Sequence, residues 1–258
     1  MIEDPWREYT KRWDLLKPPM RPTPAVVDAM VRCSAAGPVL MMGVTPEIHA
    51  AFDDITAVDR DGSMIAAIWP GDTDTKRAMR ISWQDMSWPK GTFSTVVGDC
   101  ALNMLGSLDA MREFQEGCTT WLRSGGTLVQ RIMVRPDDDV TLDDLRADMT
   151  GRINFHAFRW RLAQHIAAST DGVVGHQVCY DLFHMMCDDR DALAAASGWS
   201  RTDIDCIDLY RDSKVVIAWP TRSQWMDTVP GSAHGTEIIN VGGYDLSESC
   251  PLLRWRNP

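Results

Sequence analysis

Short apolar runs alternate with segments of helical periodicity through the first half of the chain. Residues 23–37 and 107–122 repeat apolar side chains every three or four positions, as amphipathic helices do. Four other runs have the length and continuous hydrophobicity of strands buried on both faces: residues 38–43, 55–59, 93–99 and 127–134. Strands that alternate with helices at this spacing pair in parallel through right-handed crossovers. The pattern therefore predicts a doubly wound α/β sheet over residues 25–136.

The alternation is lost after residue 136. Residues 137–213 are mostly helical in pattern, which predicts a helical insertion, and strand-like runs return within residues 214–258. Residues 1–24 begin with an amphipathic segment that ends at the prolines of KPPMRPTP. We expect a helix there that either packs on the domain or closes over a pocket as a lid. The predicted organisation is a single domain over residues 1–258.

Charge and composition exclude several classes of function. The chain has 36 acidic and 26 basic side chains, so it lacks the Lys/Arg surplus that neutralising phosphates requires, and we expect no nucleic acid partner. It shows no window of 18 apolar residues and no secretory signal, which favours a cytoplasmic protein without a membrane span. The seven cysteines form no CxxC pair and no zinc spacing, so we expect no metal.

Acidic and small residues follow the predicted strands. In an open parallel sheet, ligands bind at the carboxyl ends of the strands, where the strand order switches. A glycine there lets a ligand approach the backbone, and a carboxylate can accept hydrogen bonds from both hydroxyls of a ribose. Each residue alone also fits an ordinary turn or helix cap, so their order supports the hypothesis. The candidates are Gly43, Asp59, Asp85 with Met86 after a short strand in ISWQDMSW, and Gly98, Asp99 and Cys100.

Over residues 35–135 the chain resembles the class I methyltransferases, which use S-adenosylmethionine. The matching segments are VLMMGVTPE, ITAVDRDGSMI, ISWQDMSWP, FSTVVGDCALNML and LRSGGTLVQRIMV. The resemblance implies a mostly parallel seven-stranded sheet, the Rossmann-like methyltransferase fold, with its last strand antiparallel. The segments TEIINVG and PLLRWR suit the final hairpin of that fold.

The resemblance also implies a role for individual residues. Gly43 would lie beside the methionine moiety and Asp59, followed by Arg60, would hold the ribose. Asp85 and Met86 would contact the adenine, while Gly98, Asp99 and Cys100 would line the sulfonium end. Thr45, Pro46 and Glu47 stand where the family has a glycine-rich loop. Because S-adenosylmethionine has no phosphate, a turn with one glycine still suits it, whereas NAD needs more backbone donors.

Candidates for the substrate side come from the insertion and the two ends of the chain. His156 and Arg159 lie in one helical segment, and arginine could hold a substrate carboxylate by paired hydrogen bonds. Tyr180 and His184 are four residues apart on one helical face. A solvated helix flank or ordinary core packing explains these residues equally. The full set is His156, Tyr180 and His184 as candidate catalytic residues, and Tyr9, Trp13, Arg21, Arg159 and Tyr244 as candidate substrate-binding residues.

The sequence thus favours a methyltransferase that acts on a small molecule by in-line displacement. A non-catalytic module of the same fold that serves a protein partner is the alternative. A nicotinamide-dependent oxidoreductase is a second alternative that the glycine-poor turn disfavours. A homodimer is compatible with all three.

Overall fold

The computed structural model of this 258-residue chain describes residues 11–258. Its main sheet has seven strands in the order β3-β2-β1-β4-β5-β9-β8. The first five pair in parallel, whereas β9 is antiparallel to both of its neighbours. The doubly wound, mostly parallel seven-stranded sheet is therefore confirmed. The strands are β1 (Val39–Met42), β2 (Ile55–Asp59), β3 (Lys76–Arg80), β4 (Phe93–Asp99), β5 (Leu122–Arg131), β8 (His234–Ile239) and β9 (Leu252–Arg256).

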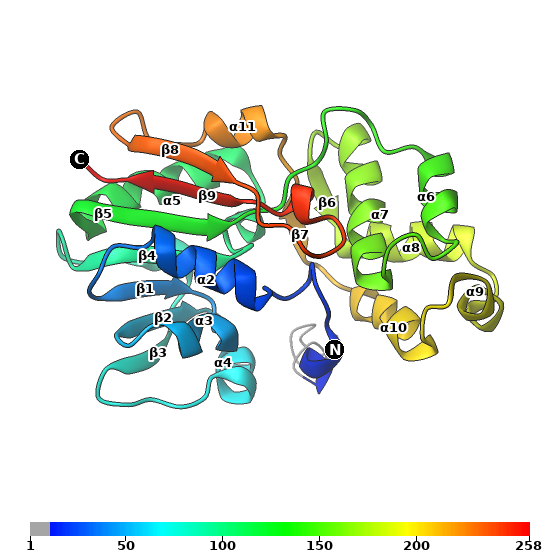
Figure 1. The fold of residues 1–258 in the computed structure, drawn as a ribbon, viewed down its shortest axis with the longest axis horizontal. Coiled ribbons are helices and arrows are strands. Elements are labelled where there is room, and N and C mark those ends of the chain that lie inside the picture. The colour runs from blue at the N-terminus through cyan, green and yellow to red at the C-terminus, as the bar shows by residue number, and fades with distance from the viewer. Residues whose placement is uncertain (1–10) are drawn as a thin grey trace.

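Helices cover both faces of this sheet (Figure 1). The continuous apolar runs predicted this arrangement, because alternate residues of each strand must be buried on opposite faces. Met41 of β1 packs in one core with Met30 of α2, and Leu40 packs in another with Met111 of α5. The hydroxyl of Thr23 accepts a hydrogen bond from Val26 N at 3.3 Å and caps α2 as expected. These helices are α2 (Pro24–Cys33), α3 (Pro46–Ala51), α4 (Gly62–Ile68), α5 (Leu108–Trp121) and α11 (Arg222–Met226).

A helical region lies beside the carboxyl ends of the strands, at the right of Figure 1. Its core is aromatic: the ring of Phe155 lies 5.8 Å from that of Phe183 and 5.3 Å from that of Trp199, both edge-on. Its helices are α6 (Leu142–Asp148), α7 (Phe155–Ser169), α8 (His176–Met186), α9 (Arg190–Ser197) and α10 (Arg201–Asp205). Short 3-10 turns complete the described chain: η1 (Trp13–Leu15), η2 (Trp83–Asp85), η3 (Leu102–Leu105), η4 (Cys206–Tyr210) and η5 (Ser247–Ser249).

One buried amide joins the sheet to the helical region. Asn103 Nδ2 donates to the carbonyl oxygens of Met133 at 3.0 Å and Ala218 at 2.7 Å. Asn103 Oδ1 accepts from Met133 N at 2.9 Å. Three hydrogen bonds that involve this fully buried side chain fix the position of strand β7 (Val216–Ala218) relative to the sheet.

Three strands differ from the sequence prediction. Residues 216–218, expected among the final strands, form β7 (Val216–Ala218), which pairs with β6 (Val173–Gly175) in a separate two-stranded sheet. The insertion therefore contains a strand, which its helical surroundings concealed. The third strand of the main sheet is Lys76–Arg80, not the ISW of ISWQDMSW. Its charged sequence is tolerated because it lies at the sheet edge.

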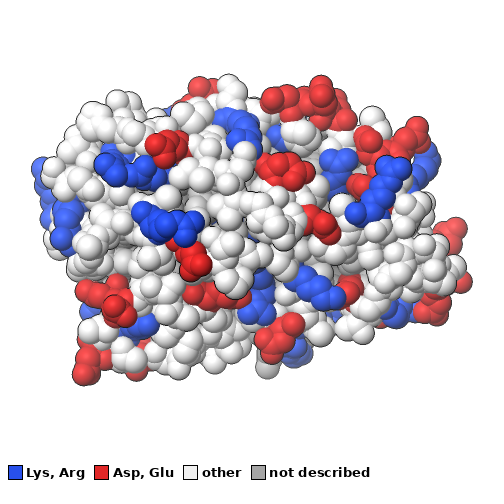
Figure 2. All heavy atoms as spheres, viewed as in Figure 1, with Lys and Arg blue, Asp and Glu red and all other residues white. Residues whose placement is uncertain are grey.

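The surface carries both signs of charge. On the face shown in Figure 2, Lys and Arg side chains are interspersed with Asp and Glu over both regions of the molecule. This mixed pattern agrees with the acidic overall balance, since no broad basic stripe covers that face. Within the described residues, no helix is both long and apolar enough to cross a membrane.

Candidate functional site

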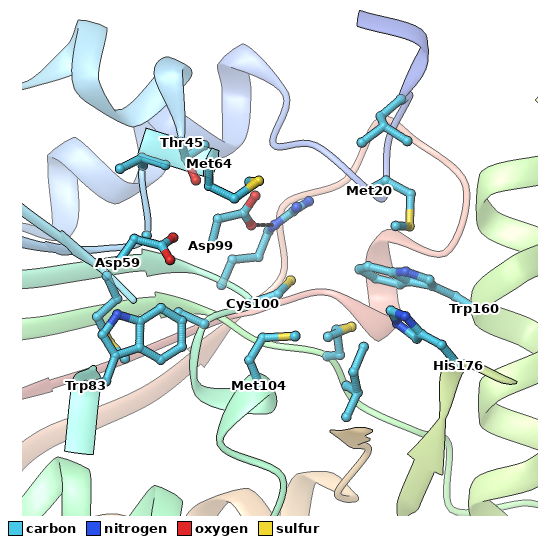
Figure 3. Close-up of a pocket in the computed structure, with 18 of the residues that line it drawn as sticks. Met20, Thr45, Asp59, Met64, Trp83, Asp99, Cys100, Met104, Trp160 and His176 are labelled. Atoms are coloured by element: carbon cyan, nitrogen blue, oxygen red, sulfur yellow. Dashed lines mark hydrogen bonds and ion pairs between the residues drawn. The ribbon is translucent and has the colours of Figure 1, made fainter. Parts of the chain in front are cut away.

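A cavity of about 200 Å³ lies at the carboxyl ends of β1, β2 and β4, between the sheet and the helical region. Figure 3 shows Asp59 and Trp83 on the sheet side of this cavity and Trp160 and His176 on the opposite side. Many of the residues predicted from the sequence line it together. They are Gly43, Thr45, Asp59, Arg60, Asp99, Cys100 and Trp13.

Gly43 occupies the tight turn that follows β1. Its φ of 82° lies in the left-handed region, which favours glycine, and its N–H donates to Val58 O at 2.9 Å. A Cβ at this position would lie 3.9 Å from Asp59 Oδ2, an ordinary contact. The backbone conformation therefore requires the glycine, and the turn brings main chain next to the Asp59 carboxylate.

Asp59 and Asp61, the two acids of AVDRDGSMI, have different roles. Asp61 caps α4: its Oδ1 accepts from Ser63 N at 2.7 Å and Met64 N at 3.2 Å. Asp59 faces the cavity, and its Oδ1 accepts from Asp61 N at 2.8 Å. Burial raises the pKa of Asp59 to about 6, although that backbone hydrogen bond opposes the shift. At neutral pH the carboxylate is ionised and poorly solvated, so donor hydroxyls from a ligand would stabilise it.

At the end of β4, the charge of Asp99 is neutralised by an ion pair. The Arg131 guanidinium and the Asp99 carboxylate form a buried salt bridge, in which Arg131 Nε donates to Asp99 Oδ1. Cys100 follows with φ of 53°, and its Sγ lies 4.0 Å from Cys250 Sγ. Burial raises the pKa of the Cys100 thiol, which is therefore protonated at neutral pH. Gly98 is packed against the side chain of Gln130, which leaves no space for a Cβ.

Trp83, rather than Asp85 and Met86, lines the sheet side of the cavity. Its Nε1 donates to Val58 O at 2.8 Å, which fixes the indole beside the end of β2. Asp85 is exposed, and Met86 is buried in the core on the α5 side of the sheet. The 3-10 turn η2 causes this arrangement because it rotates successive side chains by about a third of a turn. The sequence signal that could have identified this wall residue was the tryptophan, Trp83, within the same segment.

The N-terminal segment lies over the cavity. Trp13, Leu16 and Met20 contribute to the cavity wall. Arg21 anchors the segment: its Nε donates to Glu47 Oε1 at 2.7 Å, and its Nη1 donates to Trp13 O at 3.1 Å. Arg21 and Glu47 thus hold the cover in place without lining the cavity, and Pro46 opens helix α3 beside them. Movement of this segment as a lid stays a prediction, and Tyr9 lies outside the described residues.

The residues predicted for the substrate side mostly lie away from the cavity wall. His156 Nε2 is 3.4 Å from Asp203 Oδ1, and burial followed by the nearby Arg159 charge lowers the pKa of His156 to about 4. Arg159 is buried with its guanidinium 4.2 Å from the centre of the Tyr210 ring. The Tyr244 hydroxyl donates to Cys250 O at 3.4 Å. None of His156, Arg159 and Tyr244 is part of the cavity wall. Their roles in catalysis and substrate binding stay predictions.

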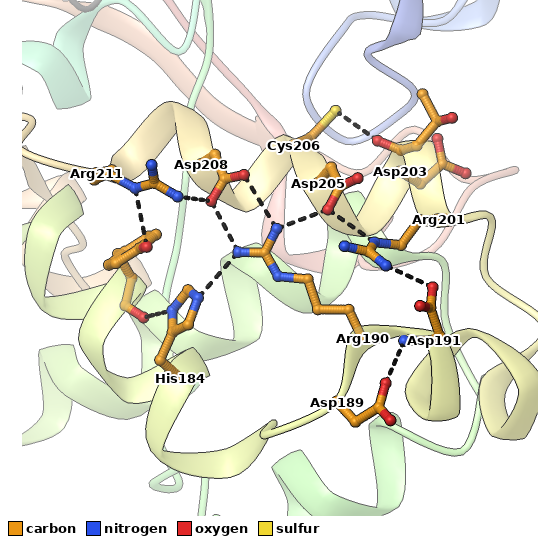
Figure 4. Close-up of polar contacts among 12 residues, drawn as sticks. His184, Asp189, Arg190, Asp191, Arg201, Asp203, Asp205, Cys206, Asp208 and Arg211 are labelled. Carbon is orange, nitrogen blue, oxygen red and sulfur yellow. Dashed lines mark hydrogen bonds and ion pairs between the residues drawn. The ribbon is translucent and has the colours of Figure 1, made fainter.

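His184 and Tyr180 belong to a polar network on the helical region (Figure 4). Arg190 Nη2 lies 3.0 Å from His184 Nε2, and an arginine can only donate, so Nε2 accepts. His184 Nδ1 must then carry the proton and donate to Tyr180 O at 2.8 Å. Tyr180 Oη accepts from Arg211 Nε at 3.0 Å. Both imidazole nitrogens of His184 are thus engaged within the protein.

The helical side of the cavity contains residues that the sequence interpretation missed. His176 stacks on Tyr210 with ring centres 4.0 Å apart, and Trp160 meets Trp219 edge-on at 5.4 Å. All four line the cavity. Burial, followed by the nearby Arg159 charge, lowers the pKa of His176 to about 3. His176 shares a buried stripe with Cys179 and Phe183 on α8, and this i, i+3, i+7 spacing was visible in the sequence.

Comparisons with known proteins support the fold. No protein-family model matches the chain, and no curated protein matches it significantly. Among solved structures, NodS N-methyltransferase from Bradyrhizobium japonicum with S-adenosyl-L-homocysteine aligns over 99% of this chain and 100% of its own, at 13% identity and TM-score 0.51. A proposed methyltransferase bound to the Trm112 activator, from Haloferax volcanii, aligns over 100% of both chains at 8% identity and TM-score 0.56.

A third solved structure, a proposed Zn-dependent alcohol dehydrogenase from Rhodobacter sphaeroides, aligns over 100% of both chains at 13% identity and TM-score 0.61. The dinucleotide-binding strand order 3-2-1-4-5-6 has no antiparallel strand between its fifth and sixth members. Here β9 occupies that position. The chain has the class I methyltransferase fold. Within residues 11–258 of this fold, no three His, Cys, Asp or Glu side chains are grouped to hold a metal ion.

Proposed function

We propose that the protein transfers a methyl group from S-adenosylmethionine to a small-molecule acceptor. The observation that supports this most directly is the Asp59 carboxylate, which faces a cavity beside the left-handed turn at Gly43. A half-buried carboxylate with a pKa of about 6, whose Oδ1 accepts from Asp61 N, is suited to a ligand that brings hydroxyl donors. The ribose of S-adenosylmethionine brings two.

The remaining cavity residues fit the other parts of this cofactor. Trp83 and Met64 offer flat and flexible apolar surface for the adenine at the ends of β2 and β3. Gly43 and Thr45 would lie along the methionine moiety, and Asp99 and Cys100 would border the sulfonium. When bound, the cofactor supplies an electrophilic methyl group, whose bond to sulfur breaks as the acceptor's lone pair bonds to carbon, while the released electron pair stays on sulfur.

The same residues fit a dinucleotide poorly. A pyrophosphate needs several backbone N–H groups that point at it from a glycine-rich turn and a helix N-terminus. Here Pro46, which has no N–H, opens α3, and α3 has only six residues. The turn can place one glycine beside the ligand but offers no row of donors, which supports S-adenosylmethionine over NAD.

The chain's own part in the reaction is alignment and exclusion of water. Methyl transfer needs the acceptor in line with the carbon–sulfur bond, in a site that water does not enter. Trp13, Leu16 and Met20 cover the cavity on one side, and Trp160 borders it on another. The Arg21–Glu47 ion pair anchors this N-terminal segment.

A non-catalytic module that serves a protein partner is the second candidate. One matched structure is a complex of a methyltransferase with its activator protein, which favours this reading for the fold. The half-buried carboxylate of Asp59 counts against it, because a protein that binds only partners gains nothing from a costly ionised group that faces a cavity.

Calorimetric titration of the dialysed protein with S-adenosylhomocysteine tests the proposal, with NAD as the control ligand. We expect micromolar binding of the first and no binding of the second. The Asp59→Asn variant should bind S-adenosylhomocysteine more weakly by about 1–3 kcal/mol because the ribose hydroxyls lose a charged acceptor. Absence of binding in folded, ligand-free protein would favour the partner-binding module instead.

A further inference from the structure

The helical side of the cavity forms an aromatic chamber, which we define by Trp160, His176, Tyr210, Ile217 and Trp219. The stacked pair His176–Tyr210 and the edge-on pair Trp160–Trp219 give it flat, rigid surfaces. In Figure 3, Trp160 and His176 lie across the cavity from Asp59, with Cys100 and Met104 between the two sides. A molecule in the chamber would therefore face the end of the cavity where Asp99 and Cys100 lie.

The chamber contains no charged side chain that would pair with an ionic molecule. Residues 155–219 supply the helical side of the cavity wall, and none of the wall residues from this range is Lys, Arg, Asp or Glu. Arg159 lies against the Tyr210 ring and is not part of the wall, and Arg131 is already paired with Asp99. His176 is neutral at physiological pH because burial and then the Arg159 charge lower its pKa to about 3. An ion would lose its hydration in the chamber and gain no counter-charge.

Trp219 provides a hydrogen-bond donor in the same wall. Its side chain is 1% exposed, and its Nε1 has no hydrogen-bond partner among residues 11–258. Buried polar atoms are nearly always paired, since an unpaired one costs about 1–3 kcal/mol. Trp225 and Trp255, which are equally buried, both donate to partners, to Met133 O and Gln115 Oε1. Because Nε1 is itself buried, an acceptor atom of a ligand in the chamber reaches it, and supplies the partner that Trp219 lacks, only when the indole ring shifts toward the cavity.

We propose that the methyl acceptor is an uncharged, planar molecule that binds in the aromatic chamber and accepts a hydrogen bond from Trp219 Nε1–H through a carbonyl oxygen or ring nitrogen. The inference rests on the proposed function only where it calls the ligand a methyl acceptor. The preference of the chamber for an uncharged, planar ligand is argued from the wall residues alone. The arginine-held carboxylate expected from the sequence stays a separate prediction, since Arg159 lies against the Tyr210 ring and is not part of the cavity wall.

Three probes with one ring and different charges test the preference: benzamide, benzoate and benzylammonium. Binding is measured by ligand-observed NMR titration, with and without saturating S-adenosylhomocysteine. We expect benzamide to bind at least about fivefold more tightly than either ion. Trp219→Phe keeps an apolar ring but removes the N–H, so it should weaken benzamide by about fivefold, the equivalent of about 1 kcal/mol for one neutral hydrogen bond. S-adenosylhomocysteine affinity should not change.

Trp88→Phe is the matched control. Trp88 Nε1 is also buried without a partner among the described residues, and its ring packs edge-on against Phe93 at 5.2 Å, away from the cavity wall. This variant should leave benzamide binding unchanged. If Trp219→Phe does not fold, Ala163→Leu serves instead, because Ala163 lines the cavity from α7 and a leucine would fill the chamber and abolish benzamide binding.

Tighter binding of benzoate, or full benzamide binding in the folded Trp219→Phe or Ala163→Leu variant, would overturn the inference. Failure of the proposed function gives a different result, since S-adenosylhomocysteine would then not bind while the preference for benzamide remained.

Discussion

Asp59 should reduce the stability of the folded protein at neutral pH. Its pKa is raised from 3.8 to about 6 by burial, so ionising it costs more in the folded than in the unfolded chain. The folded state binds more protons at Asp59 between these two values, so the contribution of Asp59 to stability is most favourable below about pH 4 and falls as the pH rises to about 6. A difference of roughly two pH units corresponds to about 3 kcal/mol.

Replacing Asp59 with asparagine removes the ionisation and keeps the shape. The asparagine Oδ1 can still accept from Asp61 N, as Asp59 Oδ1 does at 2.8 Å. We therefore expect Asp59→Asn to be more stable than the natural protein by up to about 3 kcal/mol at pH 7.5 and about equally stable near pH 4. The same variant should bind S-adenosylhomocysteine more weakly, so stability and affinity should change in opposite directions.

Urea unfolding followed by tryptophan fluorescence at pH 4.5, 6 and 7.5 measures the difference. Asp85→Asn is the control, because Asp85 is exposed at the neighbouring strand end and should show no such change. A gain that is equal at all three pH values, or no gain, would refute the argument that burial of an ionised Asp59 destabilises the fold. A gain with unchanged S-adenosylhomocysteine affinity would remove Asp59 from the cofactor site while leaving the burial argument intact.

Three further predictions concern stability. Asn103→Ala should lower the free energy of unfolding by about 2–5 kcal/mol in urea titration, because it leaves Met133 N and Ala218 O without partners, whereas exposed Asn240→Ala should cost under about 1 kcal/mol. Asp99→Asn should lower the free energy of unfolding by about 3–5 kcal/mol because it leaves the buried Arg131 charge unpaired. Adding Arg131→Met to this variant should restore part of the lost stability. If the effects of the two substitutions on the free energy of unfolding simply add, the two side chains do not interact as a pair. Gly43→Ala should lower the thermal midpoint of unfolding, because alanine in the left-handed backbone conformation costs about 1–2 kcal/mol. Gly242→Ala is the control, since Gly242 has no positive φ and should tolerate alanine. Equal effects of the two substitutions would contradict the argument from backbone conformation.

Local patterns predicted the sheet side of the molecule well. Strands buried on both faces are continuous apolar runs, so β1, β2 and β4 and the residues that end them could be located from the sequence. Gly43, Asp59 and Asp99 consequently meet in one cavity, as expected. The edge strand β3 was misplaced because an edge needs no continuous apolar run, and its sequence KRAMR has none. Asp85 and Met86 were predicted because they follow the misplaced strand, whereas the structure places Trp83 of the same segment on the cavity wall.

The helical side was harder because several faces of a helix look alike in sequence. On α8, one stripe carries His176, Cys179 and Phe183 and another carries Tyr180 and His184, and periodicity does not say which of them meets the sheet. Packing decides: Phe183 joins the aromatic core around Phe155, so His176 turns toward the cavity.

The two sides of the cavity therefore have different chemistry for a physical reason. The strand ends present charged groups, Asp59 and the Asp99–Arg131 pair, where loops and helix caps can supply hydrogen bonds to them. The helical region has to fill its interior with apolar rings to be stable, and the chamber is the part of that core which opens onto the cavity. A ligand with hydroxyls and charge is thus favoured on the sheet side, and a flat neutral one on the other. If methyl transfer occurs where they meet, exchanging Trp160 or Trp219 for smaller rings should change which acceptors are used and leave cofactor affinity unaltered.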